Sequence, residues 1–462
     1  MTMRKYIILP VVAALAATSL GSCNIYSKFK MPDDTALTAE YVKARDAEAD
    51  TAAFGNLRWQ EVFTDPVLVD LIYQALDNNK DLANAKLNVD IAHAQLLGAK
   101  LSYLPSVALN PNGAGASYDH SPISWTYQIP MAVSWEIDVF GKTLNTKRAA
   151  DASYKMSREY EQAARSQIIA AVANTYYAIA TMHRTLALQR ETSVMWAETV
   201  QTMKDLKEAG AATEAAVVQS QAQYLSIMAS ITDTEVQLEE LNNTMSLLMA
   251  VEPRVWTTGE NPVLTVASLE REEIPMRELA SRPDVRAAEY SLAAAYYATA
   301  GARAAFYPSL SISSNGGFTN LLGSAIVNPG KWFIQLAGQL SAPLFAKGAR
   351  IANLKATKAR QEQAMNTFES TLLSASAEVS SAMTTYAKAS EKSDYLKEQV
   401  VNLEKSVEIT QTLLKLGGYN TTYLEVLTAQ QSLLGAQMNA LACDLTRSRA
   451  LINLYQSLGG GR

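Results

Sequence analysis

The chain has 462 residues, of which 48% are hydrophobic and 18% are charged, and its formal net charge at pH 7 is −5. This is the balance of an ordinary globular protein, and the lack of a basic excess argues against a nucleic-acid partner. The two cysteines lie far apart and the three histidines are scattered, so their spacing matches neither a disulfide framework nor a zinc site. We therefore expect no metal and no other cofactor.

The first 23 residues have the pattern of an export signal. Two basic residues precede an apolar run from Tyr6 to Leu20, and small residues follow it. This arrangement is typical of a secretory signal peptide, which we place at residues 1–22. The sequence Leu-Gly-Ser-Cys, which ends at Cys23, resembles the bacterial lipobox. We therefore expect Cys23 to be lipidated and to become the new N-terminus. The alternative is an ordinary signal with a chance cysteine.

A lipid on Cys23 would tether the chain to a membrane without spanning it. The apolar run before it is too short for a spanning helix, and no later run of 18 or more apolar residues occurs. The sequence therefore predicts a lipidated, polar arm over residues 23–58 and no transmembrane helix.

Residues 59–117 predict helices followed by a weak strand. Apolar residues recur with helical spacing over Trp59–Asn78, and again to about Tyr103 in a second helix with Asp81 as its expected cap. Pro105 ends this helix. A strand is predicted at about 105–117, although Gly and Asn make its second half more typical of a loop.

The most regular pattern lies at Ile123–Asp138, where every odd position is apolar and every even position except Pro130 is small, polar or acidic. A period of two places the apolar side chains on one face of a strand. Soluble strands usually have about 5–6 residues, whereas a tilted strand needs roughly 9–11 to cross a bilayer. Trp125 and Trp135 lie about 33 Å apart near its ends, which matches two aromatic girdles around a lipid-facing band. The alternative is a long strand of a soluble sandwich.

Long helices are predicted after this strand. Residues 143–209 and 213–249 contain neither Pro nor Gly and consist of good helix formers, so they predict two helices separated at Gly210. The first would be roughly 100 Å long. A connector that contains Pro follows at 251–280, with a short strand expected at Val263–Val266.

The same plan then occurs a second time. A helix is predicted at 281–305, strands at 308–319 and 331–344, and helices at 349–416 and 421–458, with a break at Gly417 and Gly418. Trp332 lies in the second of these strands, and we expect it in a membrane girdle, as we do Trp125 and Trp135. Matching points lie roughly 203 to 209 positions apart, which indicates an internal duplication. We therefore predict a mainly α-helical chain with two repeats, at 59–250 and 281–458, and a small β part.

Four strands are too few to close a barrel, for which about eight is the practical minimum. A lipid-facing strand cannot leave its edge amides unpaired, because no water is present to bind them. The chain must then form an oligomer, and two, three or four copies would give eight, twelve or sixteen strands. The long helices suit packing against neighbours around a wide assembly, and the alternative is a long soluble helical hairpin.

The sequence resembles the outer membrane factor family, the TolC-like efflux ducts of Gram-negative bacteria, in its lipoprotein branch. The resemblance covers essentially the whole mature chain. Two segments carry it most specifically, the one that begins Ser281-Arg282-Pro283-Asp284-Val285 and the one that runs from Tyr423 to Gln430.

This resemblance implies a homotrimer with a twelve-stranded outer-membrane β-barrel, to which each chain contributes four strands, and a periplasmic α-barrel built from long helical hairpins. It implies docking to a periplasmic adaptor protein and, through it, to an inner-membrane pump of the resistance-nodulation-division (RND) type. The expected function is that of a passive duct in the outer membrane, not an enzyme, for drugs or other small molecules.

The family pattern also implies functional positions. Ala209, Gly210 and Ala211 match an adaptor-contact motif at the first helix tip, and Gly417 and Gly418 match the second tip. Leu424 matches a hydrophobic constriction, and Glu425 matches an acidic gate position that threefold symmetry would turn into a ring of carboxylates. Thr428 stands where relatives often have a second Asp, which puts a second acidic ring in question. The alternative for Glu425 is a solvated helix face.

Two other functions remain as alternatives from the sequence. A lipid-anchored helical scaffold that spans the periplasm without channel activity would explain the helices, but it would not explain the two tryptophans on one apolar strand face. An enzyme lacks support, since no nucleophile elbow, phosphate loop or zinc pair occurs.

Overall fold

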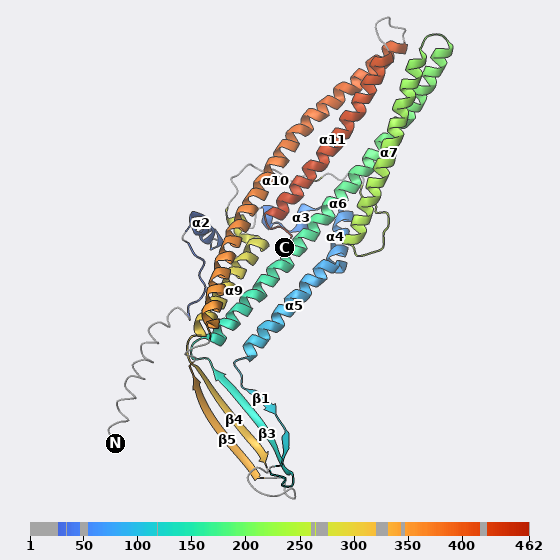
Figure 1. Ribbon diagram of the computed structural model, residues 1–462. Coiled ribbons are helices and arrows are strands. Elements are labelled where there is room, and N and C mark those ends of the chain that lie inside the picture. The colour runs from blue at the N-terminus through green and yellow to red at the C-terminus, as the bar shows by residue number, and fades with distance from the viewer. Residues whose placement is uncertain are drawn as a thin grey trace. The chain divides into compact units, whose positions relative to one another are not determined.

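The computed structural model consists of two compact units (Figure 1). The structure describes residues 26–33, 35–46, 54–117, 119–259, 264, 276–319, 331–342, 347–415 and 423–461. Unit 1 comprises Met1–Ala39, Leu87–Glu159 and Arg286–Thr371, and unit 2 comprises Glu40–Lys86, Tyr160–Val285 and Leu372–Arg462. The expected strand at Val263–Val266 lies outside the described residues except for Leu264.

The elements follow the chain in an order that repeats. They are α2 (Ala36–Arg45), η2 (Phe54–Asn56), α3 (Trp59–Val62), α4 (Pro66–Asn78), α5 (Lys80–Leu101), β1 (Ser106–Leu109), β2 (Asn112–Ala116), β3 (Ser124–Ile137), α6 (Lys142–Glu208), α7 (Glu214–Leu248), α8 (Met276–Ser281), α9 (Pro283–Ala304), β4 (Ser309–Thr319), β5 (Lys331–Ser341), α10 (Ala349–Lys415) and α11 (Tyr423–Ser457).

The two halves of the chain agree in the lengths of their helices. Helices α5 and α9 have 22 residues each, α6 and α10 have 67 each, and α7 and α11 have 35 each. Strands separate the first helix from the second in both halves. The predicted fold class is confirmed: the chain is mainly helical, internally duplicated, and carries a small sheet.

The structure corrects the prediction of one helix over Trp59–Asn78. Two helices, α3 and α4, form there because Asp65 and Pro66 start a new helix. The Asp65 carboxylate accepts hydrogen bonds from the backbone N–H of Val67 (2.9 Å) and of Leu68 (3.4 Å), and Pro66 occupies the first helical position.

The expected cap of the next helix is also corrected. Asn79, not Asp81, caps α5, because the Asn79 side-chain oxygen accepts hydrogen bonds from the N–H groups of Asp81 (2.9 Å) and Leu82 (3.1 Å). Asp81 instead lies in the first turn, where its charge complements the helix dipole.

In the Gly- and Asn-rich segment the structure has a strand, as the prediction for 105–117 expected, and not the loop that the composition suggested. Residues Asn112–Ala116 form strand β2, which pairs with β3 and places Gly113 opposite Tyr127 and Gly115 opposite Trp125. A Cβ atom on Gly115 would approach the Trp125 ring to 3.1 Å, so the missing side chain makes room for the ring. The long neighbouring strand therefore outweighs the low β propensity of the segment.

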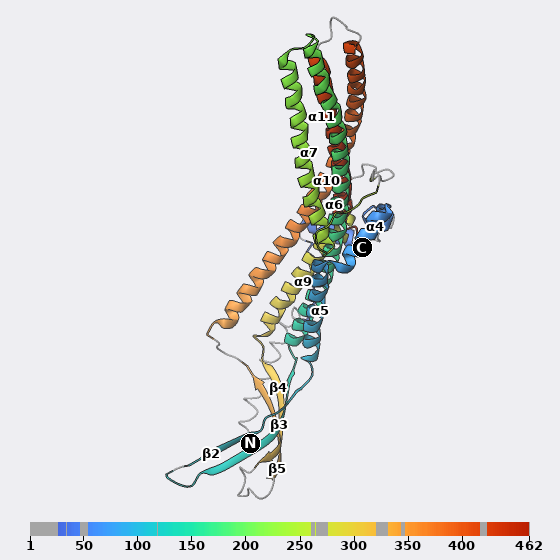
Figure 2. The same ribbon diagram turned by 90° about the vertical axis from the view of Figure 1, so that its right-hand side faces the viewer.

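The five strands among the described residues belong to one antiparallel sheet in unit 1. The order is β1–β3–β4–β5, and β2 pairs with the part of β3 that β1 does not reach. Figure 1 shows β3, β4 and β5 side by side, and Figure 2 shows the same strands after a turn of 90°. Strands β1 and β2 thus act as one interrupted strand, so the chain offers four strand positions.

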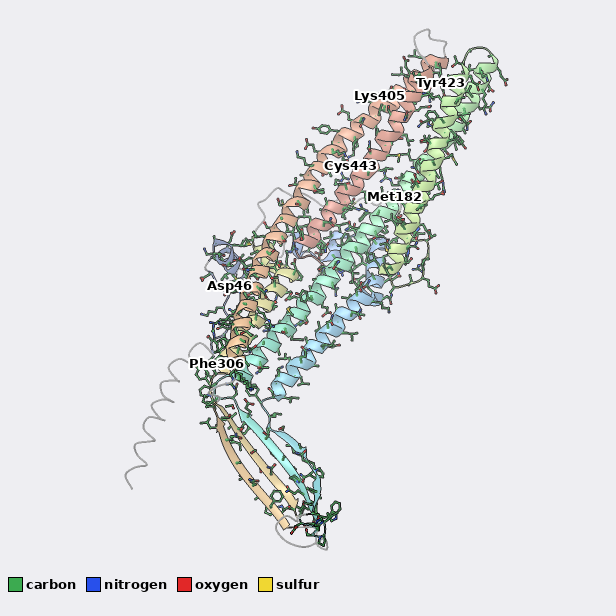
Figure 3. The ribbon with its side chains drawn as sticks, in the orientation of Figure 1. Asp46, Met182, Phe306, Lys405, Tyr423 and Cys443 are labelled. Atoms are coloured by element: carbon green, nitrogen blue, oxygen red, sulfur yellow. The ribbon has the colours of Figure 1, made fainter. Side chains whose placement is uncertain are left out.

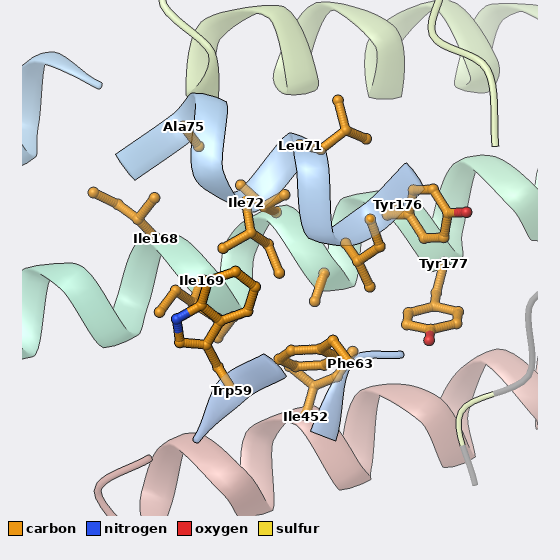
Figure 4. Packing of buried hydrophobic residues seen from close by; sticks show 14 of the residues in the cluster. Trp59, Phe63, Leu71, Ile72, Ala75, Ile168, Ile169, Tyr176, Tyr177 and Ile452 are labelled. Carbon is orange, nitrogen blue, oxygen red and sulfur yellow. The ribbon is translucent and has the colours of Figure 1, made fainter. Parts of the chain in front are cut away.

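Unit 2 contains a large apolar core. Trp59 and Phe63 of the N-terminal segment pack against Ile169 of α6 and Ile452 of α11 (Figure 4). The Tyr176 hydroxyl lies 2.6 Å from the Asp65 carboxylate and accepts a hydrogen bond from the Gly259 N–H at 2.8 Å. Burial and the Asp65 carboxylate both raise the pKa of Tyr176, so the hydroxyl stays protonated and ties α6 to the start of α4 and to the connector.

None of the described helices combines the length and the hydropathy that a membrane span requires.

Candidate functional site

One face of the sheet in unit 1 is apolar. Strand register shows which side chains share this face, because directly paired residues point to the same side. One cross-strand row joins Ile129, Phe318 and Trp332, and another joins Trp135 to Ile312. Other members of the face are Val107, Leu109, Trp125, Met131, Leu310, Ile334, Leu336 and Leu340.

Apart from Leu310, which is half-buried, these apolar side chains are exposed in the single chain. The exposed fraction is 64% for Trp125, 68% for Trp332 and 74% for Leu336. A contiguous apolar face of this size normally lies against protein or lipid. A strand inside a soluble sandwich would bury this face within its own chain, so the exposure favours a membrane-facing sheet over that alternative.

The three tryptophans that we expect in the membrane girdles lie at different levels of this face. Trp125 and Trp135 are near opposite ends of β3, and the Trp135 indole N–H donates a hydrogen bond to the Tyr103 carbonyl at 2.9 Å. Trp332 lies at the start of β5 in register with Phe318. Their role at the membrane surface stays a prediction.

The opposite face of the sheet is polar. Its paired rows join Gln128 to Thr319, Asn315 to Gln335 and Ser311 to Gln339. Within the described strands, the outer edge of β5 and the outer edge of the β1–β2 strand have no pairing partner. A sheet with one apolar face, one polar face and two unpaired edges can line a water-filled passage only if further strands complete it.

The N-terminal arm is bound at the base of the sheet in unit 1. Arg148 of α6 donates hydrogen bonds to the carbonyls of Tyr26 (3.0 Å) and Ser27 (3.3 Å). On α9, the Tyr297 hydroxyl accepts a hydrogen bond from the Phe29 N–H at 3.0 Å. The Tyr26 hydroxyl donates to the carbonyl of Val139, just after β3. The arm thus joins helices from both repeats.

Cys23, the expected lipid site, lies outside the described residues, three positions before Tyr26 in the sequence.

The first helix tip, at one end of unit 2, is a well-defined reversal. Gly210 has a φ of +72°, and its N–H donates to the Lys207 carbonyl at 2.9 Å while the Ala211 N–H donates to the Leu206 carbonyl at 2.8 Å. These two bonds form a Schellman motif, which satisfies the last carbonyls of α6. Thr213 then caps α7 by accepting a hydrogen bond from the Ala216 N–H.

This reversal exposes the predicted adaptor-contact residues. Ala209, Gly210 and Ala211 are all exposed, and a Cβ on Gly210 would meet nothing within 4 Å. An ion pair between Lys207 and Glu214 joins the two helices beside the reversal. The tip therefore offers backbone and methyl groups that a partner can approach closely.

The start of α11 carries the predicted gate residues, at the same end of unit 2 (Figure 3, where Tyr423 marks it). Leu424, Glu425 and Thr428 are exposed, and the Thr428 hydroxyl donates back to the Leu424 carbonyl at 2.8 Å. That bond uses the Thr428 hydroxyl within its own helix. Gly417 and Gly418 lie outside the described residues.

A contact between the two hairpins lies beside these residues. The hydroxyl oxygens of Tyr423 on α11 and Ser220 on α7 are 3.3 Å apart. Below them Leu427 packs into a cluster with Leu186, Trp196 and Ile227, which come from α6 and α7. The cluster fixes one face of α11, and the opposite exposed face is the one that presents Leu424 and Glu425.

The sequence motif around Arg282 has a structural role that we did not predict. The Arg282 side chain is only 8% exposed and donates to Asp284 (2.7 and 3.0 Å), to Glu378 of α10 (2.8 Å) and to the carbonyl of Ser457 in α11 (2.7 Å). Burial lowers its pKa, but hydrogen bonds to the two carboxylates outweigh this and raise it. The Arg-Pro-Asp motif could have indicated the Arg282–Asp284 ion pair, because an aspartate two positions after an arginine lies within its reach.

Arg282 borders a cavity of about 840 Å³ in unit 2, which polar residues of α6, α10 and α11 also line. No group of three or more His, Cys, Asp or Glu side chains that could hold a metal ion occurs in the part of the chain that the structure describes. Cys443 is buried in α11, and burial raises the pKa of its thiol.

A sheet with an exposed apolar face, a polar opposite face and unpaired edges is typical of a subunit that completes a β-barrel in a membrane. A family model described as outer membrane efflux protein matches residues 71–251 and 274–460. The chain belongs to this outer membrane efflux protein family.

Individual relatives agree with this assignment. The probable outer membrane lipoprotein SilC of Salmonella typhimurium is 28% identical over 417 residues, which cover 88% of this chain and 89% of SilC. The cation efflux system protein CusC of Escherichia coli is 26% identical over 98% of both chains. The solved structure of the outer-membrane channel OprN matches 95% of this chain and 99% of its own, with 24% identity and a TM-score of 0.83.

The chain is therefore an outer-membrane duct of a tripartite efflux system, and it extends into the periplasm. Members of this family are channels rather than enzymes.

Proposed function

We propose that three copies of the chain assemble into one passive duct. One observation carries this proposal: the four strand positions of a single chain have a largely exposed apolar face and two unpaired edges among the described residues. In a membrane those edges must be paired. Because the four positions alternate in direction, β5 of one copy meets the β1–β2 strand of the next in an antiparallel arrangement, and the ladder continues without a break.

The copy number comes from the resemblance to TolC-like ducts. Three copies supply twelve strands for the barrel in the membrane and twelve long helices for the periplasmic barrel. The polar sheet face then lines the passage and the apolar face contacts lipid. Cys23 carries the lipid that anchors each copy, after removal of the signal peptide at 1–22.

The duct does not act alone in this proposal. A periplasmic adaptor contacts the tips at Ala209–Ala211 and at Gly417 and Gly418, and it connects the duct to an inner-membrane pump of the RND type. Leu424 and Glu425 form the periplasmic constriction, with Glu425 as a ring of three carboxylates. The chain itself makes and breaks no bonds, and drugs or other small molecules diffuse through it.

The repeat boundaries are part of the same proposal. Residues 59–250 and 281–458 are two copies of one unit, joined by the connector at 251–280 and preceded by the arm at 23–58. Equal helix lengths in the two halves support this division.

Planar-bilayer recording of the purified full-length protein tests the proposal. We expect discrete conductance steps, which are larger in a variant whose constriction is weakened by Leu424→Ser. The alternative of a helical scaffold predicts a silent bilayer with both proteins. A silent bilayer in spite of proven insertion would therefore overturn the proposed duct.

A further inference from the structure

The polar face of the sheet has an unusual composition for a protein surface. Strand register assigns it residues from all four strand positions. They are Ser106, Ala108, Asn112, Ala114 and Ala116; Ser124, Thr126, Gln128, Pro130, Ala132, Ser134 and Glu136; Ser309, Ser311, Ser313, Asn315, Gly317 and Thr319; and Lys331, Phe333, Gln335, Ala337, Gln339 and Ser341. Amides, hydroxyls and small side chains dominate this face.

Only two ionisable residues, Glu136 and Lys331, belong to this face in the described strands, and they lie at opposite ends of it. Glu136 lies one row from the Ser309–Ser341 row at the helix end of the sheet, and Lys331 begins β5 at the other end. The Glu136 carboxylate forms an ion pair with Lys142 at 3.0 Å, so its charge is balanced locally. The rows between these two ends contain no ionisable side chain.

The absence of charge in these rows has a direct consequence for a passage. A ring of like charges at a narrow point attracts one sign of ion and repels the other. Amide side chains such as Asn315 and Gln335 both donate and accept hydrogen bonds, and hydroxyls do the same. The polar face can therefore form hydrogen bonds with the hydration shells of cations, anions and neutral solutes alike.

We propose that the sheet section of the duct does not discriminate by charge, so that it accepts cationic, anionic and neutral small molecules. This inference rests on the proposed function, in which the polar face lines the passage. Any preference for one sign of cargo then arises outside the sheet, in the helical part of the duct, of which Glu425 is the candidate position.

One apolar row interrupts the polar face, and packing within the sheet explains it. Phe333 pairs with Gly317, which in turn pairs with Pro130. A Cβ on Gly317 would lie 2.1 Å from the Ile129 carbonyl oxygen, so only glycine fits there. A large ring beside a strand glycine covers the exposed backbone. Phe333 therefore has a structural role and adds no charge to the polar face.

A thiol-labelling experiment tests the inference on the assembled, full-length protein. Gln335→Cys places a thiol on the polar face in the middle of the uncharged rows, and Leu336→Cys places one on the apolar face beside it. Cys443 is only 4% exposed, and its raised pKa keeps the thiol protonated, so it gives little background. Each variant is reacted with a cationic and with an anionic methanethiosulfonate reagent.

We expect the Gln335→Cys thiol to react with both reagents, with the same ratio of rates that free cysteine shows in the same buffer. Adding Ser313→Asp in the neighbouring row should shift that ratio severalfold toward the cationic reagent, which proves that the assay detects charge. A severalfold preference in Gln335→Cys alone would overturn the inference.

The Leu336→Cys variant separates this result from a failure of the proposed function. In lipid nanodiscs we expect its thiol to react with neither reagent, because the side chain faces lipid. Reaction of Leu336→Cys together with silence of Gln335→Cys would reverse the assigned faces. That outcome would contradict both the proposed passage and the inference.

Discussion

Gly210 shows how a single residue shapes the first helix tip. Its φ of +72° lies in the left-handed region, where a Cβ atom crowds the following carbonyl at a cost of about 1–2 kcal/mol. Space is not the constraint, because no other atom lies within 4 Å of the position that a Cβ atom would occupy there. The backbone conformation alone therefore selects glycine at this position.

We expect Gly210→Ala to destabilise the end of α6 by about 1 kcal/mol. Native-state hydrogen exchange of the Ala211 and Ala212 amides, which close the helix end on Leu206, measures the change. Gly435→Ala is the matched control, since Gly435 is exposed within α11 and also has open space around it. That change should stabilise its helix by roughly 0.5–1 kcal/mol. Equal effects of both changes would contradict the role of the positive φ.

Glu425 is the residue on which the proposed gate depends. Three exposed carboxylates at a narrow mouth raise the local concentration of cations. Glu425→Gln should therefore lower the ratio of potassium to chloride permeability in planar bilayers and weaken block by divalent cations. Glu408→Gln, which removes another exposed acid on α10, should leave the ratio unchanged. If Glu425→Gln has no effect on the ratio, the acidic constriction lies elsewhere.

Some individual residues could be predicted from the sequence and others could not. The helix break at Gly210 was predictable, because Gly210 is the one glycine between two long segments of good helix formers. The cap of α5 was not, because Asn79 and Asp81 are both good capping residues and only the position of the first turn decides between them. Arg282 stood in a noticeable motif, but two of its partners, Glu378 and Ser457, are 96 and 175 positions away.

At the scale of elements, strand β3 was predictable in full, because a period of two over this length has no helical interpretation. Strand β2 was predictable only in part, since its Gly- and Asn-rich sequence has low β propensity and depends on β3 as a template. The difference is physical: β3 carries its own pattern, whereas β2 is specified by a neighbour.

A pair of adjacent positions in β3 tests which face contacts lipid. Ile129→Lys places a charge on the apolar face, and at mid-depth a charge costs about 2–4 kcal/mol per chain. We expect this variant to be lost from the outer-membrane fraction. Gln128→Lys changes the next residue on the opposite face and at nearly the same depth, so it should insert normally. Normal insertion of both variants would count against the assigned face.

The N-terminal arm is held by contacts that a second pair of variants can separate. Arg148→Ala removes the donor to the carbonyls of Tyr26 and Ser27, and hydrogen bonds to a charged group contribute about 1.5–3 kcal/mol. We expect the arm to detach locally and trypsin to cut faster at Lys28 and Lys30.

Lys147→Ala serves as the control for the arm. Lys147 lies beside Arg148 on α6, but its ammonium group packs over the Tyr103 ring at 5.9 Å from the centroid. Trypsin cleavage of the arm should stay at the wild-type rate in this variant. Faster cleavage in the control and not in Arg148→Ala would show that the described clamp does not hold the arm.

At the scale of the whole molecule, duplication explains why one chain cannot complete the duct. Each half supplies two strand positions and one long helical hairpin, so the chain ends with four strand positions and two open edges. The need for several copies follows from unpaired edges in lipid and was predictable from the sequence. The number of copies was not predictable from the strands, because two, three or four copies would give barrels of eight, twelve or sixteen strands, and each of these can close.

Native mass spectrometry of the full-length protein, released gently from detergent, tests the copy number. We expect a single assembly with three times the mass of one chain, because the resemblance to TolC-like ducts implies twelve strands. Replacing Leu340 in the edge strand β5 with Pro disturbs the strand that the next copy must pair with, because proline cannot donate a ladder hydrogen bond, so this variant should yield mainly single chains. A control variant, Leu340→Val, keeps the N–H and the apolar surface and should remain assembled. An assembly of two or four copies in the unaltered protein would contradict the twelve-stranded barrel, while still satisfying the requirement that every edge be paired.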